Sequence, residues 1–108
     1  MEFLEHPIFA RQREGILDDA GLTSLMIILT DRPDVGVLIP SGRGLRKVRV
    51  AVKGKGKSGG ARVIYYWQRQ EPDDSLITFL SIYSKNRKEN LSAKELKFLR
   101  NLIEEDKP

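Results

Sequence analysis

The residues of this chain that could do chemistry are mostly cations, and they gather in one window of the sequence. Between Asp34 and Glu71 there is no acidic residue, but there are nine basic ones. These are Arg43, Arg46, Lys47, Arg49, Lys53, Lys55, Lys57, Arg62 and Arg69. Lys and Arg side chains hold phosphate groups and neutralise charge that develops on them. The window therefore indicates a site for a phosphate-bearing polyanion such as nucleic acid.

The rest of the chain has the opposite charge balance. The whole sequence of 108 residues has 19 Lys and Arg against 15 Asp and Glu, a net charge of +4. Outside the window, 10 basic residues stand against 15 acidic ones, a net charge of −5. A charge run is often only a solvated surface. Here, however, cations without a single acid extend over more than 30 positions, and they repel one another unless a partner neutralises them.

Such a patch could also cleave RNA without a metal ion. The 2′-hydroxyl attacks its neighbouring phosphate, and the protein must align the attack, neutralise the growing charge and move protons. Lys and Arg can neutralise the charge, and a lysine whose pKa is lowered by like-charged neighbours can help to move the proton. The sequence permits this chemistry without demonstrating it.

Three other chemistries lack the sequence context that they need. The run 51–58 fits a loose phosphate-loop spacing, but glycines and a strand pattern follow it where a nucleotide hydrolase needs a helix. His6 is the only histidine, cysteine is absent, and the carboxylates lack the spacing of metal ligands. We therefore expect no metal site, no cofactor and no Ser-His-Asp arrangement.

Strands are expected to position the basic residues. From Arg46 to Lys53 the residues alternate with period two, which predicts a half-buried strand with Lys47 and Arg49 side by side on one face. The following run 53–60 has four glycines in eight residues and predicts a mobile hairpin loop. A second strand is expected at Ala61–Gln68, and a third, central one at the apolar run Leu76–Tyr83.

The flanking elements predict an α+β domain. They are an edge strand at Met1–Glu5, a short helix at Pro7–Glu14, a helix at Ala20–Asp31 capped by Asp18 or Asp19, a connector or short strand at Val35–Pro40, and a C-terminal helix. A strand through Met26–Thr30 is the alternative to the second helix. Ser92 and Glu95 have the spacing of a capping box at the start of the C-terminal helix.

The composition is that of one folded domain, residues 1–108. The absence of cysteine suits a reducing compartment. The first residues carry acids where a signal peptide needs bases, and the longest apolar run, near Leu25–Leu29, is far shorter than a membrane span. We therefore expect a cytoplasmic protein with no membrane partner.

Several runs of the sequence are similar to one known family. They are 44–51 (GLRKVRVA), 53–60 (KGKGKSGG), 62–66 (RVIYY) and 82–86 (IYSKN). Together they resemble the RelE/HigB superfamily of bacterial toxins, and most closely its HigB-like branch with a hairpin rich in glycine and lysine. The specific match extends roughly from Gly42 to Asn86, whereas the flanking helices agree in order and length only.

The resemblance implies the toxin of a type II toxin–antitoxin pair. Such toxins enter the A site of the 70S ribosome and cut the mRNA there, which halts translation. A cognate antitoxin silences them, and in the HigB-like branch it is usually a helix-turn-helix, HigA-like protein. The implied fold is a twisted antiparallel sheet with two N-terminal helices and one C-terminal helix.

The resemblance also implies roles for residues. Lys47 and Arg49 match a pair of cations two apart on a strand, Arg62 matches an arginine opening the next strand, and Lys85, or with a shift Arg87, matches a basic residue after the last strand. The expected catalytic residues are therefore Lys47, Arg49, Arg62 and Lys85. The expected RNA-binding residues are Arg43, Arg46, Lys53, Lys55, Lys57 and Arg87. The family's acid–base Tyr or His has no counterpart in the run 86–91, so the general base is unassigned, with Tyr66 and Tyr83 as substitutes that also suit a sheet or core position.

Two alternatives come from other classes of function. The same fold could be a non-catalytic module that binds RNA or the ribosome and leaves mRNA intact. It could also be a toxin that acts on a protein, in which case its affinity for RNA would not depend steeply on salt.

Overall fold

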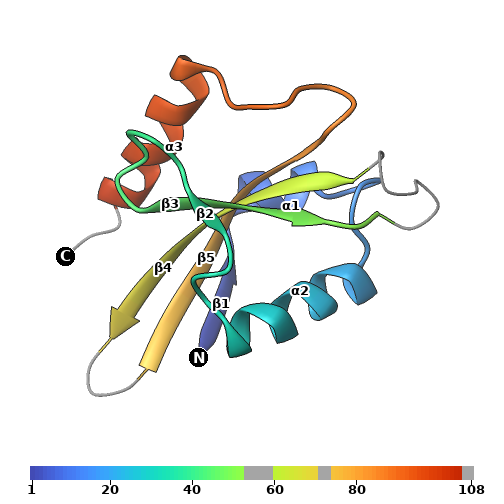
Figure 1. The fold of residues 1–108 in the computed structure, drawn as a ribbon, viewed down its shortest axis with the longest axis vertical. Coiled ribbons are helices and arrows are strands. Elements are labelled where there is room, and N and C mark those ends of the chain that lie inside the picture. The colour runs from blue at the N-terminus through green and yellow to red at the C-terminus, as the bar shows by residue number, and fades with distance from the viewer. Residues whose placement is uncertain (53–59, 71–73, 106–108) are drawn as a thin grey trace.

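The computed structural model describes residues 1–52, 60–70 and 74–105 (Figure 1). Its elements are β1 (Glu2–Glu5), α1 (Pro7–Gln12), α2 (Asp19–Asp31), β2 (Val37–Leu38), β3 (Leu45–Val50), β4 (Ala61–Gln70), β5 (Asp74–Ser84) and α3 (Ala93–Glu105). The predicted hairpin loop at 53–60 lies, except for Gly60, outside the described residues. The α+β class and the order of the elements agree with the prediction.

The five strands form one sheet in the order β1-β5-β4-β3-β2. The pairs β2–β3, β3–β4 and β4–β5 are antiparallel, as expected. However, β1 pairs parallel with β5, so the sheet is mixed and not purely antiparallel. The apolar run Leu76–Tyr83 was predicted to be a central strand, and β5 is an internal strand between β1 and β4. Strands cover β5 on both edges and helices cover the sheet on both faces, which explains the apolar run.

Helices cover both faces of the sheet, with α2 and α3 on opposite sides (Figure 1). On one face, Phe9 of α1 and Leu22, Leu25 and Leu29 of α2 pack on the sheet. On the other face, Leu99 and Ile103 of α3 pack on a second cluster from β3, β4 and β5. Strand residues alternate between the two clusters, so each internal strand serves both cores.

Caps define the two N-terminal helices. The Asp18 carboxylate accepts from the Gly21 backbone N–H at 2.8 Å, so α2 begins at Asp19. The strand alternative for residues 26–30 is therefore wrong: the three- and four-residue spacing of the leucines decides over the β-branched pair Ile27 and Ile28. His6 caps α1, because its Nδ1 accepts from Ile8 N–H at 3.1 Å. The lone histidine is thus a helix-entry residue.

A buried tyrosine holds the chain where it turns into β2. The Tyr65 hydroxyl donates to the Pro33 carbonyl and accepts from the Gly36 N–H, both at 2.8 Å. The Arg46 guanidinium donates to the carbonyls of Asp34 and Gly36 at 3.1 and 2.8 Å. These bonds fix the position of β2 at the edge of the sheet.

The predicted capping box begins α3. Ser92 N–H donates to a Glu95 carboxylate oxygen at 2.9 Å, and Glu95 N–H donates to the Ser92 hydroxyl at 3.1 Å. Two backbone donors that the helix leaves open are thereby satisfied.

Replacing Ser92 with alanine is expected to lower the free energy of unfolding by about 1 kcal/mol, because the Glu95 N–H loses its acceptor. Urea denaturation followed by circular dichroism would measure the change. Ser24→Ala is the matched control, because Ser24 is an exposed residue inside α2, where alanine is the better helix former. An equal loss of stability in both variants would contradict the capping role.

Candidate active site

Three cations lie on the face of the sheet that α3 covers. Lys47 and Arg49 are two residues apart on β3, so both side chains project to the same face as the buried Leu45. Arg49 pairs with Arg62 of β4, which in turn pairs with Tyr83 of β5. Because cross-strand partners share a face, Arg49, Arg62 and Tyr83 form one row across three strands, with Lys47 beside it. We call these four residues the cation row.

Arg62 is a buried cation. Its side chain is only 5% exposed, and its Nη1 donates to the neighbouring Ala61 carbonyl at 3.3 Å. Among the described residues no carboxylate pairs with it, and its neighbour on β3 is another cation, Arg49. A buried charge without a counter-charge is unfavourable. The fold therefore maintains a positive charge here that a bound anion would compensate.

The segment that joins β5 to α3 reaches back to the cation row. Asn90 Oδ1 accepts from Lys47 Nζ at 2.9 Å, and the Glu89 carbonyl accepts from the Tyr83 hydroxyl at 3.4 Å. Lys88 forms an ion pair with Glu95 of α3, and its Nζ lies 5.0 Å from the centre of the Tyr83 ring. These contacts bring the segment and the cation row together at one place.

Tyr83 is held as a neutral phenol. It is buried, and burial raises its pKa above the ordinary value, with the nearby charge of Arg62 opposing the shift. Burial disfavours the phenolate because the low-polarity surroundings solvate the anion poorly. At neutral pH Tyr83 is therefore a hydrogen-bond donor and not a base.

The Glu95 carboxylate ties this segment to α3 in a pH-dependent way. The Lys88 ammonium is the main cause that lowers the pKa of Glu95, and the Ser92 N–H adds to it. A carboxylate whose pKa is lower in the folded state stabilises the fold above its unfolded pKa and loses that contribution as pH falls through the folded value.

We therefore expect the difference in unfolding free energy between the native chain and Glu95→Gln to be largest near pH 7 and to shrink as pH falls below about 4. Denaturation at a series of pH values would measure it. Glu2→Gln serves as the control, because Glu2 is exposed on β1. A difference that stays constant down to pH 2 would contradict the ion pair.

The other predicted site residues are spread over the structure. Arg46 points away from Lys47, toward the α2 face, where it bonds backbone carbonyls and lies 5.9 Å from the Trp67 ring centre. Arg43 lies in the turn before β3 and pairs with Glu104 of α3. Lys85 and Arg87 lie in the turn after β5. The predicted residues Lys53, Lys55 and Lys57 are outside the described residues.

The structure adds Asn90 and Lys88 to the site, neither of which was predicted. Asn90 lies 43 positions from Lys47 in the sequence, and no local pattern connects the two. The only sequence signal for these two residues was the polar run 84–90 before the capping box, because it carries several side chains that can form hydrogen bonds.

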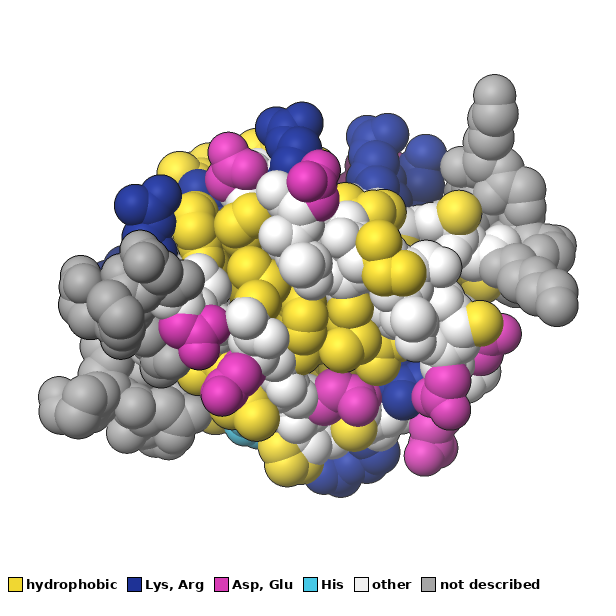
Figure 2. Space-filling view, turned by 90° about the horizontal axis from the view of Figure 1, so that it is seen from below, with side chains coloured by type: hydrophobic (Ala, Val, Ile, Leu, Met, Phe, Trp, Pro, Cys, Tyr) yellow, Lys and Arg dark blue, Asp and Glu magenta, His cyan; other side chains and the backbone are white. Residues whose placement is uncertain are grey.

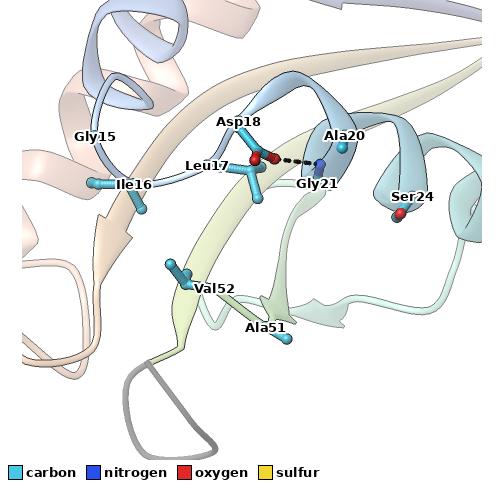
Figure 3. Close-up of a pocket in the computed structure, with 9 residues that line it drawn as sticks. All are labelled: Gly15, Ile16, Leu17, Asp18, Ala20, Gly21, Ser24, Ala51 and Val52. Atoms are coloured by element: carbon cyan, nitrogen blue, oxygen red, sulfur yellow. Dashed lines mark hydrogen bonds between the residues drawn. The ribbon is translucent and has the colours of Figure 1, made fainter. Parts of the chain in front are cut away.

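A cavity lies away from the cation row. It is about 430 Å³ in volume and lies between the start of α2 and the end of β3. Figure 3 shows Leu17 and Val52 lining it and Asp18 turned toward the Gly21 N–H. Among the described residues that line it, Asp18 is the only charged one.

The view from below in Figure 2 shows a band of hydrophobic side chains with acidic ones around it, and with Lys and Arg mostly along the rim. In the described part of the chain no three His, Cys, Asp or Glu side chains come together as a metal site would require. None of the described helices combines the length and the apolar character needed to cross a membrane.

The fold and the cation row define a class, a small α+β protein with a basic face on its sheet. The family is shown by a match over residues 35–105 to the RelE toxin of the RelE/RelB toxin–antitoxin system. The chain belongs to this toxin family. It is thus of the kind that pairs with an antitoxin, and toxins of this family are generally endoribonucleases. The match includes Lys47, Arg49, Arg62 and Asn90.

Proposed function

We propose that this toxin is an endoribonuclease that cuts mRNA in the ribosomal A site and so halts translation in the cytoplasm. The observation that supports this most is the buried charge of Arg62, which has no carboxylate partner among the described residues. Two more cations, Lys47 and Arg49, share its face. A phosphodiester placed over this row would supply the missing negative charge.

The proposed mechanism needs no metal ion. The 2′-hydroxyl attacks the neighbouring phosphorus, its proton leaves to water, and the bond to the 5′-oxygen breaks. Lys47 stabilises the forming 2′-alkoxide, whereas Arg49 and Arg62 stabilise the charge that grows on the phosphate oxygens. In this proposal Tyr83, a neutral phenol, gives a proton to the leaving 5′-oxygen and regains one from water. The products are a 2′,3′-cyclic phosphate and a 5′-hydroxyl.

In this proposal, the other cations that the sequence analysis singled out bind RNA, with the exception of Arg46. Lys85 and Arg87, in the turn after β5, and Arg43, before β3, contact the backbone of mRNA or ribosomal RNA, as do Lys53, Lys55 and Lys57. As an alternative, Lys85 stabilises charge on the scissile phosphate, which is the catalytic role that the resemblance implies. For Arg46 we propose a structural role instead, because its guanidinium is engaged on the opposite face.

The proposed identity of the antitoxin rests on the resemblance to the HigB-like branch. We assign the chain, as one domain, to that branch and expect its antitoxin to be a helix-turn-helix, HigA-like protein. Co-expression with the neighbouring open reading frame, followed by co-purification, would test this partner. A stable complex with a partner of another DNA-binding class would contradict the assignment.

Toeprinting would test the activity. Purified protein is added to an mRNA on translating ribosomes and, in parallel, to the same mRNA alone. Cuts at A-site codons only in the presence of ribosomes are the expected result. Cuts in free RNA would indicate a general ribonuclease.

A second candidate function is a non-catalytic module that binds RNA or the ribosome. The neutral state of Tyr83 favours it, because the described site then contains no evident general base. Ribosome binding that leaves the mRNA uncut in the toeprint would establish this function and remove the catalytic roles.

A further inference from the structure

A groove of about 380 Å³ opens beside the cation row. One wall is apolar and consists of residues 37–40, from β2 and the turn after it, together with Leu91 and Leu96. The other end is polar and contains Lys47, Tyr83 and Asn90. The volume and the mixture of an apolar wall with a few converging polar groups are typical of a site for a small molecule.

The apolar wall is open to solvent and firmly supported. Val37, which pairs with Lys47 and so shares its face, is 71% exposed. The turn that follows is held to α3, because Arg100 donates to the Ser41 carbonyl at 2.8 Å and Arg43 pairs with Glu104. The wall is therefore a fixed apolar surface, against which a planar base can pack.

The polar end of the groove offers donors. A lysine ammonium can only donate, so the Asn90 atom at 2.9 Å from Lys47 must be the side-chain oxygen. The amide nitrogen of Asn90 is then left with its hydrogens, and no acceptor for it exists among the described residues. Lys47 also keeps hydrogens beyond the one given to Asn90. The ligand edge that fits must carry acceptors next to each other.

We infer that this groove binds the base of the nucleotide whose 2′-hydroxyl attacks, and that Asn90 selects guanine or cytosine there. This inference rests on the proposed nuclease function, because Lys47 belongs to both the phosphate site and the groove. Guanine presents N7 and O6 as adjacent acceptors, and cytosine presents N3 and O2. Adenine has its N6 donor beside N7 and N1, and uracil has its N3 donor between its two acceptors. Neither base offers two adjacent acceptors, so one donor of the protein would be left without a partner.

The first test is the base preference of cleavage. The toeprint is run on mRNAs that differ in one base at the cut position. The native protein is expected to cut after guanine or cytosine at least about fivefold more than after adenine or uracil, the lower end of the discrimination by a paired base contact. Asn90→Asp removes the amide donors, and its carboxylate binds Lys47, so the preference should disappear or reverse.

The control is Asn101→Asp, which makes the same change of charge at an exposed residue of α3 outside the groove. It should keep the native preference. Cleavage by the native protein without preference among the four bases would overturn the inference while the nuclease function stands. The same preference in Asn90→Asp as in the native protein would also overturn it.

A binding experiment separates the two proposals if no mRNA is cut. The side-chain amide signals of Asn90 are followed by NMR while guanosine, cytidine, adenosine or uridine 5′-monophosphate is added. Signals that move with the guanosine and cytidine nucleotides only would support the groove even though the nuclease function had failed. Without cleavage, signals that do not move, or move equally with all four, would overturn it.

Discussion

Arg62→Ala is expected to lower mRNA cleavage by about 10²–10³-fold, the usual effect of removing a group that stabilises charge in the transition state. The variant should still fold. Arg62 has no carboxylate partner among the described residues, so its removal leaves no opposite charge unpaired, and the loss of an uncompensated buried charge offsets part of the cost of the cavity. The toeprint on translating ribosomes measures the rate, and circular dichroism measures the folding.

Arg11→Ala is the matched control, because Arg11 is exposed on α1, on the other side of the sheet. It should cut mRNA at the native rate. Arg62→Lys keeps the charge but loses the planar fork of donors, and it should recover part of the activity. Native cleavage by a folded Arg62→Ala protein would remove Arg62 from the mechanism and weaken the proposed phosphate site.

Phe79→Ala is expected to lower the free energy of unfolding by about 3–5 kcal/mol, a large share of the roughly 5–15 kcal/mol of a typical domain. Phe79 is fully buried. Its ring stacks on Phe3 of β1 at 5.8 Å and on Phe9 of α1 at 5.2 Å between centroids. The substitution removes the contact that joins three elements and leaves a cavity between them.

Phe98→Ala is the control for the loss of an aromatic ring. Phe98 is 50% exposed on α3, so its removal should cost much less. Urea denaturation of both variants gives the two free energies. Equal losses would mean that the stacked cluster under β1 and α1 does not hold the fold together.

Local patterns in the sequence predicted most of the elements. The alternation around Lys47 and Arg49 determines that both side chains lie on one face of β3, because successive residues of a strand point to opposite sides. Asp18 and the pair Ser92 and Glu95 mark where helices begin, since the groups that cap a helix lie within three residues of one another. Such relations depend on neighbours in the chain and need no knowledge of the rest of the fold.

The strand neighbours that local patterns did not predict have a physical reason as well. The parallel pairing of β1 with β5 joins segments more than 70 residues apart, and no local pattern specifies it. The place of β4 in the middle of the sheet depends on which strand edges the other strands occupy. An apolar run indicates that a strand is buried, but it does not show which strands lie beside it.

The sequence by itself determined a concentrated positive charge, the pair Lys47 and Arg49 on one face of a strand, and the helix caps. Only the tertiary structure decided that Arg62 is buried beside Arg49 and Tyr83, and that Asn90 meets Lys47. The reason is that two features depend on how the two cores pack on one sheet: the register of the strands, and the path of the segment from β5 to α3 that carries Asn90. This packing is a property of the whole chain that no single segment contains.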